Sequence, residues 1–235
     1  MRFATPLKKP NELNVPVQTG AATTALVYPA EPNGVAPAAL ILAHGAGAGQ
    51  RSAFMVEFAR ALSALGLDIV TFNFLYTEQN RRIPDRPALL EACYLAVIEK
   101  VRAELESARQ ALYIGGKSMG GRIATQVAAA DPAVPVAGLV LLGYPLHPPG
   151  KPEQRRDKHL PAVGRRMLFL QGSRDAFGTP AELAPILSPL EPAATLHEVA
   201  HGDHSFKLPR KDPAAQAALH ADLQRVIEAW ILSAP

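Results

Sequence analysis

Short apolar runs alternate with segments of helical periodicity along most of the chain. Between the runs, apolar side chains recur at helical spacing over 54–65, 90–105, 119–130, 181–187 and 219–230. The apolar runs themselves are as long and continuous as strands buried on both faces, and they cover 38–43, 67–74, 111–115, 136–142, 167–170 and 194–199. Strands that alternate with helices form a parallel sheet with helices on both faces. We therefore expect a doubly wound, mostly parallel α/β fold.

The 22 prolines of this 235-residue chain support that division. Proline is excluded from helix interiors and central strands, and none occurs in 38–83 or 88–131. Segment 15–28 is expected to add a hairpin at one edge of the sheet. No linker, repeat or low-complexity tract marks a second domain. We expect one domain over 1–235, with its core at about 24–235 and with 1–23 as an extension or edge hairpin.

Composition excludes several classes of protein. The chain is 48% hydrophobic and 19% charged, which indicates a globular and not a disordered protein. A lone cysteine, Cys93, rules out an internal disulfide and zinc sites that need two or more cysteines; it is expected in the core. The formal charge of +3 is too small for a nucleic-acid signature. Segment 1–10 has basic residues but no apolar run of the length that a signal peptide needs, and no stretch of the chain is apolar for the length of a membrane span. We expect a cytoplasmic protein without nucleic-acid or membrane partners, and its oligomeric state stays open.

The most informative segment is GGKSMGG at 115–121, between a predicted strand and a predicted helix. It contains Gly116-x-Ser118-x-Gly120, the nucleophile-elbow pattern, in which the serine projects from a strained turn and its neighbours must be small. The Met119 N–H would then lie at a helix N-terminus, where it is free to stabilise an oxyanion. An ordinary glycine-rich turn is the alternative. A phosphate-binding loop is excluded, because the glycine it needs five residues before Gly116 is Ala111, inside the predicted strand.

A serine nucleophile needs a histidine base and a carboxylate, which follow it in that fold in the order serine, acid, histidine. Asp175 lies just past the end of one predicted strand, where open α/β sheets place their sites. Past the last strand lie His201 and His204, and either can reach the serine; His204 is better placed within the loop. The spacing of the two histidines is also seen in metal sites, but no glutamate base accompanies it. We expect neither a metal nor a cofactor.

A fourth element is His44-Gly45-Ala46-Gly47, directly after the strand at 38–43. Its glycines allow the backbone to turn and to present the Ala46 N–H towards the nucleophile. Together with the Met119 N–H, this group would complete a two-donor oxyanion hole. A plain strand–helix turn is again the alternative.

The combination of HGAGAG, GGKSMGGR, GSRDAFG and GDHSF resembles the small α/β-hydrolases of the dienelactone-hydrolase-like group, and within it a branch of predicted hydrolases with a GGKSMGGR-type elbow. The resemblance covers the chain from about residue 24 to its end. It implies a catalytic triad of Ser118, Asp175 and His204, with Ala46 and Met119 as backbone donors. Ala176 stands where that branch has proline, which would loosen the acid loop slightly.

The function that these elements predict is hydrolysis of a carboxylic ester or thioester of a small molecule through an acyl-enzyme on Ser118. The alternative is a non-catalytic interaction module that keeps the fold. Segment 144–164 is too short for a large cap, so we expect an open, shallow site with at most one short helix at 153–159. Several residues after strand ends are candidates to line it, although core packing explains them equally well: Leu75, Tyr76, Tyr144, Phe177 and Phe206.

Charge adds one expectation about the substrate. Residues 151–166 carry six basic and two acidic side chains. Arg165 and Arg166 directly precede a strand and are expected at the edge opposite the site. The other basic residues are either ordinary solvated groups or a rim that attracts anionic substrates; they comprise 151–158, Arg81, Arg82, Lys117, Lys207, Arg210 and Lys211.

Overall fold

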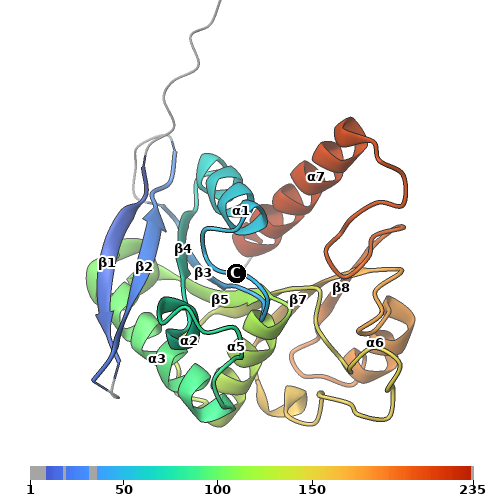
Figure 1. Ribbon diagram of the computed structural model, residues 1–235, viewed down its shortest axis with the longest axis horizontal. Helices are drawn as coiled ribbons and strands as arrows, with labels where there is room; N and C mark the ends of the chain where they lie inside the picture. The colour runs from blue at the N-terminus through green and yellow to red at the C-terminus, as the bar shows by residue number, and fades with distance from the viewer. Residues whose placement is uncertain (1–8, 18–19, 32–35, 234–235) are drawn as a thin grey trace, which may run out of the picture.

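The sheet is strongly twisted and organises the whole molecule (Figure 1). The computed structural model describes residues 9–17, 20–31 and 36–233, and in this part of the chain eight strands pair in the order β1-β2-β4-β3-β5-β6-β7-β8. The pairs from β4 to β8 are parallel, whereas β1 and β2 form an antiparallel hairpin that joins β4 at one edge. The strands are β1 (Asn11–Pro16), β2 (Ala22–Tyr28), β3 (Ala39–Ala43), β4 (Asp68–Phe72), β5 (Leu112–Lys117), β6 (Gly138–Leu142), β7 (Arg166–Gly172) and β8 (Thr195–Val199).

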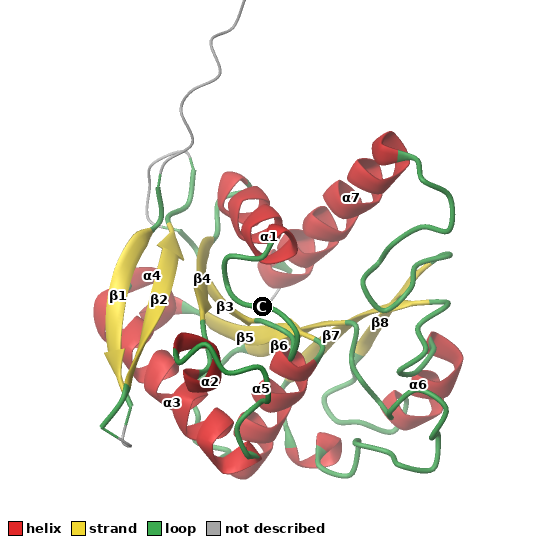
Figure 2. Ribbon diagram, in the orientation of Figure 1, coloured by secondary structure: helices red, strands yellow, loops and turns green. Residues whose placement is uncertain are grey.

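Helices cover both faces of this sheet (Figure 2). On one face lie α1 (Ala53–Ala64) and α7 (Pro213–Leu232). The other face is covered by α2 (Leu75–Glu78), α3 (Pro87–Glu104), α4 (Glu106–Gln110), α5 (Met119–Ala130), a 3-10 turn η1 (Leu160–Ala162) and α6 (Pro180–Leu187). The doubly wound α/β arrangement predicted from the sequence is thus confirmed.

Each face of the sheet has its own hydrophobic core, because neighbouring residues of a strand point to opposite faces. In β3, Ile41 packs with α3 and α5, while Leu40 and Leu42 pack with α1 and α7. Cys93 of α3 is fully buried in the first of these cores, as predicted, and burial raises the pKa of its thiol to about 12. Within the described residues, no helix has both the length and the hydropathy needed to cross a membrane.

Two predicted helices differ from the structure. The helix expected over 90–105 ends at Glu104, because Leu105 adopts an extended conformation (φ −105°, ψ 127°) from which α4 starts anew. The short helix expected at 153–159 is absent, because the backbone bonds across the loop instead: the Arg156 N–H donates to the Leu146 carbonyl at 2.8 Å. One turn of 3-10 helix, η1, follows this segment. Residues 1–8 of the expected N-terminal extension lie outside the described residues.

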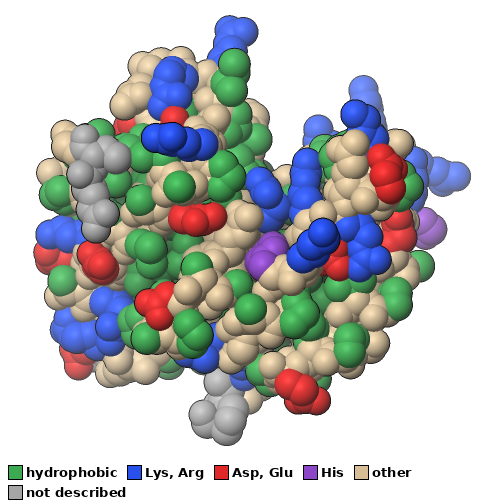
Figure 3. All heavy atoms as spheres, turned by 90° about the horizontal axis from the view of Figure 1, so that it is seen from below, with side chains coloured by type: hydrophobic (Ala, Val, Ile, Leu, Met, Phe, Trp, Pro, Cys, Tyr) green, Lys and Arg blue, Asp and Glu red, His purple; other side chains and the backbone are tan. Residues whose placement is uncertain are grey.

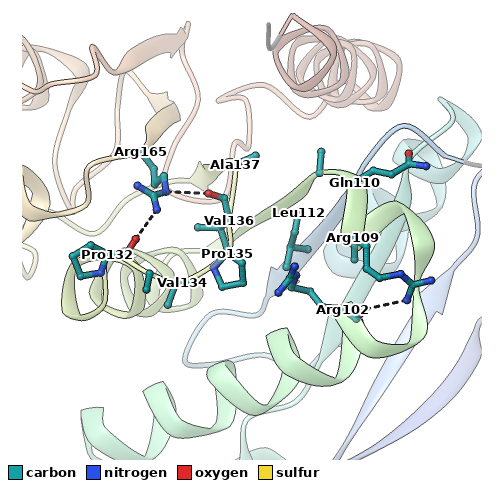
Figure 4. Close-up of a pocket in the computed structure, with 13 residues that line it drawn as sticks. Arg102, Arg109, Gln110, Leu112, Pro132, Val134, Pro135, Val136, Ala137 and Arg165 are labelled. Atoms are coloured by element: carbon teal, nitrogen blue, oxygen red, sulfur yellow. Dashed lines mark hydrogen bonds between the residues drawn. The ribbon is translucent and has the colours of Figure 1, made fainter.

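Parallel strands direct their carboxyl ends to one edge of the sheet, and the loops after β3, β5, β7 and β8 meet there. The opposite edge carries Arg165 and Arg166, as expected. The Arg165 guanidinium donates to the carbonyls of Pro132 (2.6 Å) and Val136 (3.1 Å), both in the segment between α5 and β6 (Figure 4). The Arg166 guanidinium stacks 4.0 Å from the ring of Trp230.

Candidate active site

Ser118 occupies a sharp turn between β5 and α5. Its backbone has φ 51° and ψ −116°, a conformation that non-glycine residues rarely adopt. The turn brings its two glycine neighbours against β3: a Cβ atom on Gly116 would lie 2.3 Å from the Ala43 carbonyl oxygen, and one on Gly120 would lie 2.4 Å from the same atom. Any side chain at either position would collide with this backbone. The spacing of the motif therefore follows from the packing of the turn.

Ser118, His204 and Asp175 form an unbroken chain of hydrogen bonds. Ser118 Oγ lies 2.8 Å from His204 Nε2, and His204 Nδ1 lies 2.8 Å from Asp175 Oδ2. The Asp175 side chain is fully buried, and its Oδ1 accepts a further hydrogen bond from the Phe177 N–H at 2.8 Å. Because the carboxylate accepts from Nδ1–H, Nε2 is left to accept from the serine hydroxyl. This is the arrangement in which a histidine can take the proton of a serine.

The loop after β8 brings His204, and not His201, to the serine. His201 is exposed and turns away at φ 61°, where its backbone N–H donates to Ser173 Oγ at 2.8 Å. The His204 ring instead stacks on Phe177, with ring centroids 4.1 Å apart. This contact limits how the imidazole can rotate, and thereby supports its alignment with Ser118.

Lys117, the last residue of β5, lies inside the site. Its ammonium group donates to the backbone carbonyl of His204 and lies 5.2 Å from the centre of the Phe206 ring. Burial lowers the pKa of Lys117 to about 8, and the negative charges of Asp175 and Asp203 offset part of that effect. The side chain thus connects the serine turn to the histidine loop.

His44 holds the loop after β3. It is fully buried, its Nε2 accepts from the Phe74 N–H at 3.2 Å, and its Nδ1–H donates to the Gly45 carbonyl at 2.8 Å. This pairing requires the neutral ring, and burial lowers the pKa of His44 accordingly. Tyr76 adds a second restraint, because its hydroxyl donates to the Ala46 carbonyl at 3.0 Å.

Ala46 and Met119 both line the cleft that contains Ser118. The Met119 N–H is the first of α5, so it has no acceptor within the helix. Among the residues that the structure describes, neither this N–H nor that of Ala46 is paired. Both groups are therefore available to an oxygen atom in the cleft.

The cleft has a volume of about 910 Å³, within the range of small-molecule sites. Helices α1 and α7 wall one side of it, and the start of α3 walls another. These walls contribute Phe54 and Glu57 from α1, Gln216 and His220 from α7, and Pro87 and Leu90 from α3. Sequence reasoning missed these six residues, since an amphipathic pattern does not reveal which helix end overhangs a site.

The described chain matches one protein family, Alpha/beta hydrolase domain, over residues 36–232. It belongs to the α/β hydrolase family. Membership confirms the resemblance to small α/β hydrolases that the four motifs indicated, and it supports the prediction of a hydrolase enzyme.

Solved structures of this fold agree with the assignment. An α/β serine hydrolase without a lid from Xanthomonas campestris is 24% identical, with a TM-score of 0.72, and the match covers 98% of this chain and 100% of that one. Dienelactone hydrolase from Anabaena variabilis is 20% identical, with a TM-score of 0.72 and coverage of 96% and 98%. The esterase domain of a Rhodothermus marinus protein is 14% identical, with a TM-score of 0.70 and coverage of 95% and 98%. At these identities the likeness shows the fold.

Four of the five residues that we expected to line the cleft of this α/β hydrolase do not line it. Phe177 does. The others turn inward over the sheet and are buried in the two cores: Leu75, Tyr76, Tyr144 and Phe206. Two of them still contact residues of the site: the Tyr76 hydroxyl donates to the Ala46 carbonyl, and the Phe206 ring packs against the Lys117 ammonium.

Most of the basic residues that we considered as a rim of the site do not line the cleft. Of the expected rim, only three residues line the cleft, namely Lys117, Arg156 and Lys207. Arg122 lines it as well and was missed as a charged group of the site, although it ends the GGKSMGGR motif. On the face seen in Figure 3, lysine and arginine side chains gather beside a histidine.

Proposed function

We propose that this α/β hydrolase is a serine hydrolase that cleaves a carboxylic ester or thioester of a small molecule through an acyl-enzyme on Ser118. The observation that carries this proposal is the hydrogen-bond chain from Ser118 Oγ through His204 to Asp175, with both distances at 2.8 Å, inside an accessible cleft. Family membership and the ester-cleaving proteins among the solved structures of this fold support it.

In the proposed reaction, Ser118 Oγ attacks the carbonyl carbon while its proton passes to His204 Nε2. The substrate oxygen gains negative charge and accepts from the N–H groups of Ala46 and Met119. His204 then gives the proton to the leaving alcohol or thiol as its bond to the carbonyl carbon breaks. Asp175 keeps the imidazole in the required tautomer and stabilises the transient imidazolium.

Water completes the cycle. A water molecule enters the vacated position, loses a proton to His204 Nε2 and attacks the acyl carbon. Collapse of this second tetrahedral species releases the acid and returns the proton to Ser118 Oγ. Every step uses side chains of this chain, two backbone N–H groups and water, so the proposed reaction requires no cofactor.

The alternative function is a non-catalytic interaction module with a vestigial triad. Such a protein is free to lose the serine–histidine contact, to pair the two backbone donors or to fill the cleft. The intact hydrogen bonds, the two unpaired N–H groups among the described residues and the volume of about 910 Å³ all favour the enzyme.

A labelling experiment tests this proposal. A fluorophosphonate is expected to modify Ser118, identified by peptide mapping, and Ser118→Ala is expected to abolish both labelling and hydrolysis of p-nitrophenyl esters of increasing acyl length. Ser52→Ala and Ser205→Ala are the matched controls, because both serines line the same cleft, and both variants are expected to remain labelled. Modification of Ser52 or Ser205 in the wild type, or full hydrolysis by Ser118→Ala, would refute the proposal.

A further inference from the structure

Two arginines line the cleft that contains Ser118. Arg122 lies one helical turn after Ser118 on α5, and its N–H donates to the Ser118 carbonyl at 3.1 Å. Arg156 lies in the loop between β6 and β7, where its backbone carbonyl accepts from the Tyr144 hydroxyl at 2.6 Å. Both backbones are thus anchored to the framework that positions the serine.

Neither guanidinium has a partner within the described part of the chain. No hydrogen bond or ion pair involves either side chain there, and Arg122 Nε is buried without an acceptor. The two carboxylates that line the cleft are already engaged elsewhere. Glu57 lies 2.8 Å from His220 and Asp85 lies 2.6 Å from Arg81.

Asp157, the carboxylate next to Arg156 in sequence, is engaged too. It forms a two-pronged ion pair with Arg155. The loop therefore supplies a carboxylate for Arg155 and none for Arg156, which is left facing the cleft with Arg122.

Holding these two positive charges together is unfavourable. Burial, and then the charge of Arg156, lower the pKa of Arg122, while Tyr144 and Glu91 offset part of this effect without forming an ion pair. Like charges close together in a partly buried site repel each other, and a bound anion relieves that repulsion. A planar carboxylate is matched to the guanidinium fork, because each arginine can donate two parallel N–H groups to it.

The opposite edge of the sheet offers an instructive contrast (Figure 4). Arg102, Arg109 and Arg165 surround a pocket of about 350 Å³ there. The Arg109 guanidinium donates to the carbonyls of Arg102 and Ala103, and that of Arg165 to Pro132 and Val136. Those two guanidinium groups hold the backbone in place, whereas Arg102, like Arg122, has a buried Nε without an acceptor among the described residues. The cleft differs in that neither of its two arginines, Arg122 and Arg156, forms a side-chain hydrogen bond there.

We propose that Arg122 and Arg156 form a carboxylate-binding subsite, and that the substrate is an ester or thioester whose acyl or leaving part carries a carboxylate. This inference rests on the proposed function, and it names the substrate class of the same site. The carboxylate would bind between the two arginines while the scissile carbonyl reaches Ser118.

Matched ester pairs test the subsite by hydrolysis. For the acyl part, the p-nitrophenyl half-esters of succinate, glutarate and adipate are compared with p-nitrophenyl butyrate, valerate and hexanoate, which have equal carbon counts. For the leaving part, 4-acetoxybenzoate is compared with 4-acetoxybenzamide. We expect at least one anionic ester to exceed its neutral partner in kcat/KM by tenfold or more. Arg122→Gln and Arg156→Gln are each expected to lower that ratio at least tenfold, and added salt to lower it in the wild type.

Arg225→Gln is the matched control, because its side chain is 64% exposed on α7 and does not line the cleft; it is expected to keep the wild-type ratio. If neutral and anionic esters are hydrolysed through Ser118 and neither cleft variant changes any ratio, the subsite is refuted while the proposed function stands.

Calorimetric titration with glutarate reads the subsite without turnover. The subsite is supported if the wild type binds glutarate and if the affinity falls at least fivefold in Arg122→Gln and in Arg156→Gln. This result would support the subsite even if the protein hydrolysed no ester. If neither anion preference nor glutarate binding is found in the wild type, the proposal is wrong. Glutaramide is the neutral control ligand, and it is expected not to distinguish the variants.

Discussion

The Lys117 ammonium donates a hydrogen bond to the backbone carbonyl of His204, so the residue before the proposed nucleophile, Ser118, holds the histidine proposed as its base. Two segments more than 80 residues apart in sequence are thereby joined within the site. The bond lies directly beneath the cleft, over the ring of Phe206. Lys117 is a positioning residue, since it acts on the reacting atoms only through His204.

Replacing Lys117 by methionine tests this role. Lys117→Met keeps the apolar stem but leaves the His204 carbonyl without its donor, which allows the imidazole to shift. We expect kcat to fall about 100-fold, as is typical when a reacting group is misplaced by about 1 Å, with little change in KM. Lys151→Met is the control, because Lys151 is exposed. An unchanged kcat would show that the loop keeps its position without the lysine.

The same variant has a stability readout. Because the pKa of Lys117 is about 8 in the folded protein, against an ordinary value of 10.5, the unfolded chain retains a proton between these pH values that the folded chain has lost. The free energy of unfolding of the wild type should therefore rise relative to Lys117→Met from about pH 8 to 10.5. Parallel curves in urea titrations over that range would contradict the burial of a lysine with a low pKa.

His44 is expected to control both the position of the loop after β3, which carries Ala46, and the stability of the protein at acid pH. His44→Phe leaves the Phe74 N–H unpaired, at a cost of about 1–3 kcal/mol, and releases the Gly45 carbonyl. If the Ala46 N–H is misplaced as a result, kcat should fall by about 10²–10³. His197→Phe, on the edge strand β8, is the control. Wild-type activity in His44→Phe would show that His44 is not needed to position the Ala46 N–H.

The pH dependence follows from the lowered pKa of His44. As the pH falls below the ordinary value of 6.5, the unfolded chain takes up a proton on this residue before the folded chain does. His44 should therefore contribute a loss of stability below pH 6.5 that is absent from His44→Phe. Chemical unfolding at several pH values between 4.5 and 7.5 measures the difference between the two proteins.

Gly120 is expected to tolerate no side chain. In Gly120→Ala the new Cβ atom would lie 2.4 Å from the Ala43 carbonyl oxygen, so α5 must move away from β3. We expect a loss of about 1–3 kcal/mol or more in stability, together with loss of activity, because Ser118 and Met119 move with the helix. Gly47→Ala serves as the stability control, since its Cβ atom meets open space. Equal melting temperatures for the two variants would contradict this packing.

Asp175→Asn is expected to preserve the fold and remove most of the activity. The carboxylate accepts from His204 on one oxygen and from the Phe177 N–H on the other. An amide has only one oxygen, so its NH₂ group must face a donor and the imidazole adopts the wrong tautomer. A fall in kcat of about 10⁴ is typical of such a change in a triad. Asp222→Asn, on the exposed face of α7, is the control, and a variant with more than a tenth of wild-type kcat would argue against the triad.

The sequence predicted the sheet and the meeting of the site residues for the same reason. Continuous apolar runs reveal buried strands, and parallel strands send their following loops to one edge, so Ser118, Asp175 and the loop with His201 and His204 were expected to meet. His204 was preferred for its place in that loop, and the resemblance to small α/β-hydrolases implied it; the structure brings it to Ser118. The contacts among Ser118, Asp175 and His204 agree with that expectation. Their catalytic roles stay predictions until the labelling experiment is done.

The walls of the cleft were beyond the reach of the sequence. A residue that follows a strand can point up into solvent or down over the sheet, and Tyr144 and Phe206 point down. Arg122 shows the opposite case. The sequence predicted that Arg122 lies on α5. It could not predict that Arg122 has no ion pair, because that depends on where the nearby carboxylates lie in the folded chain and which partners they take: Glu57, Asp85, Glu91 and Asp157. Such pairings exist only in the folded molecule.

The buried thiol of Cys93 has a practical consequence for every covalent experiment on this protein. A thiol reacts as its thiolate, and a group with a pKa near 12 in a closed core supplies almost none at neutral pH. Because the chain has no second cysteine, electrophiles that attack sulfur should leave the native protein unmodified and react only after unfolding. Alkylation of Cys93 thus reports the integrity of the fold, independently of any reagent that reads the serine.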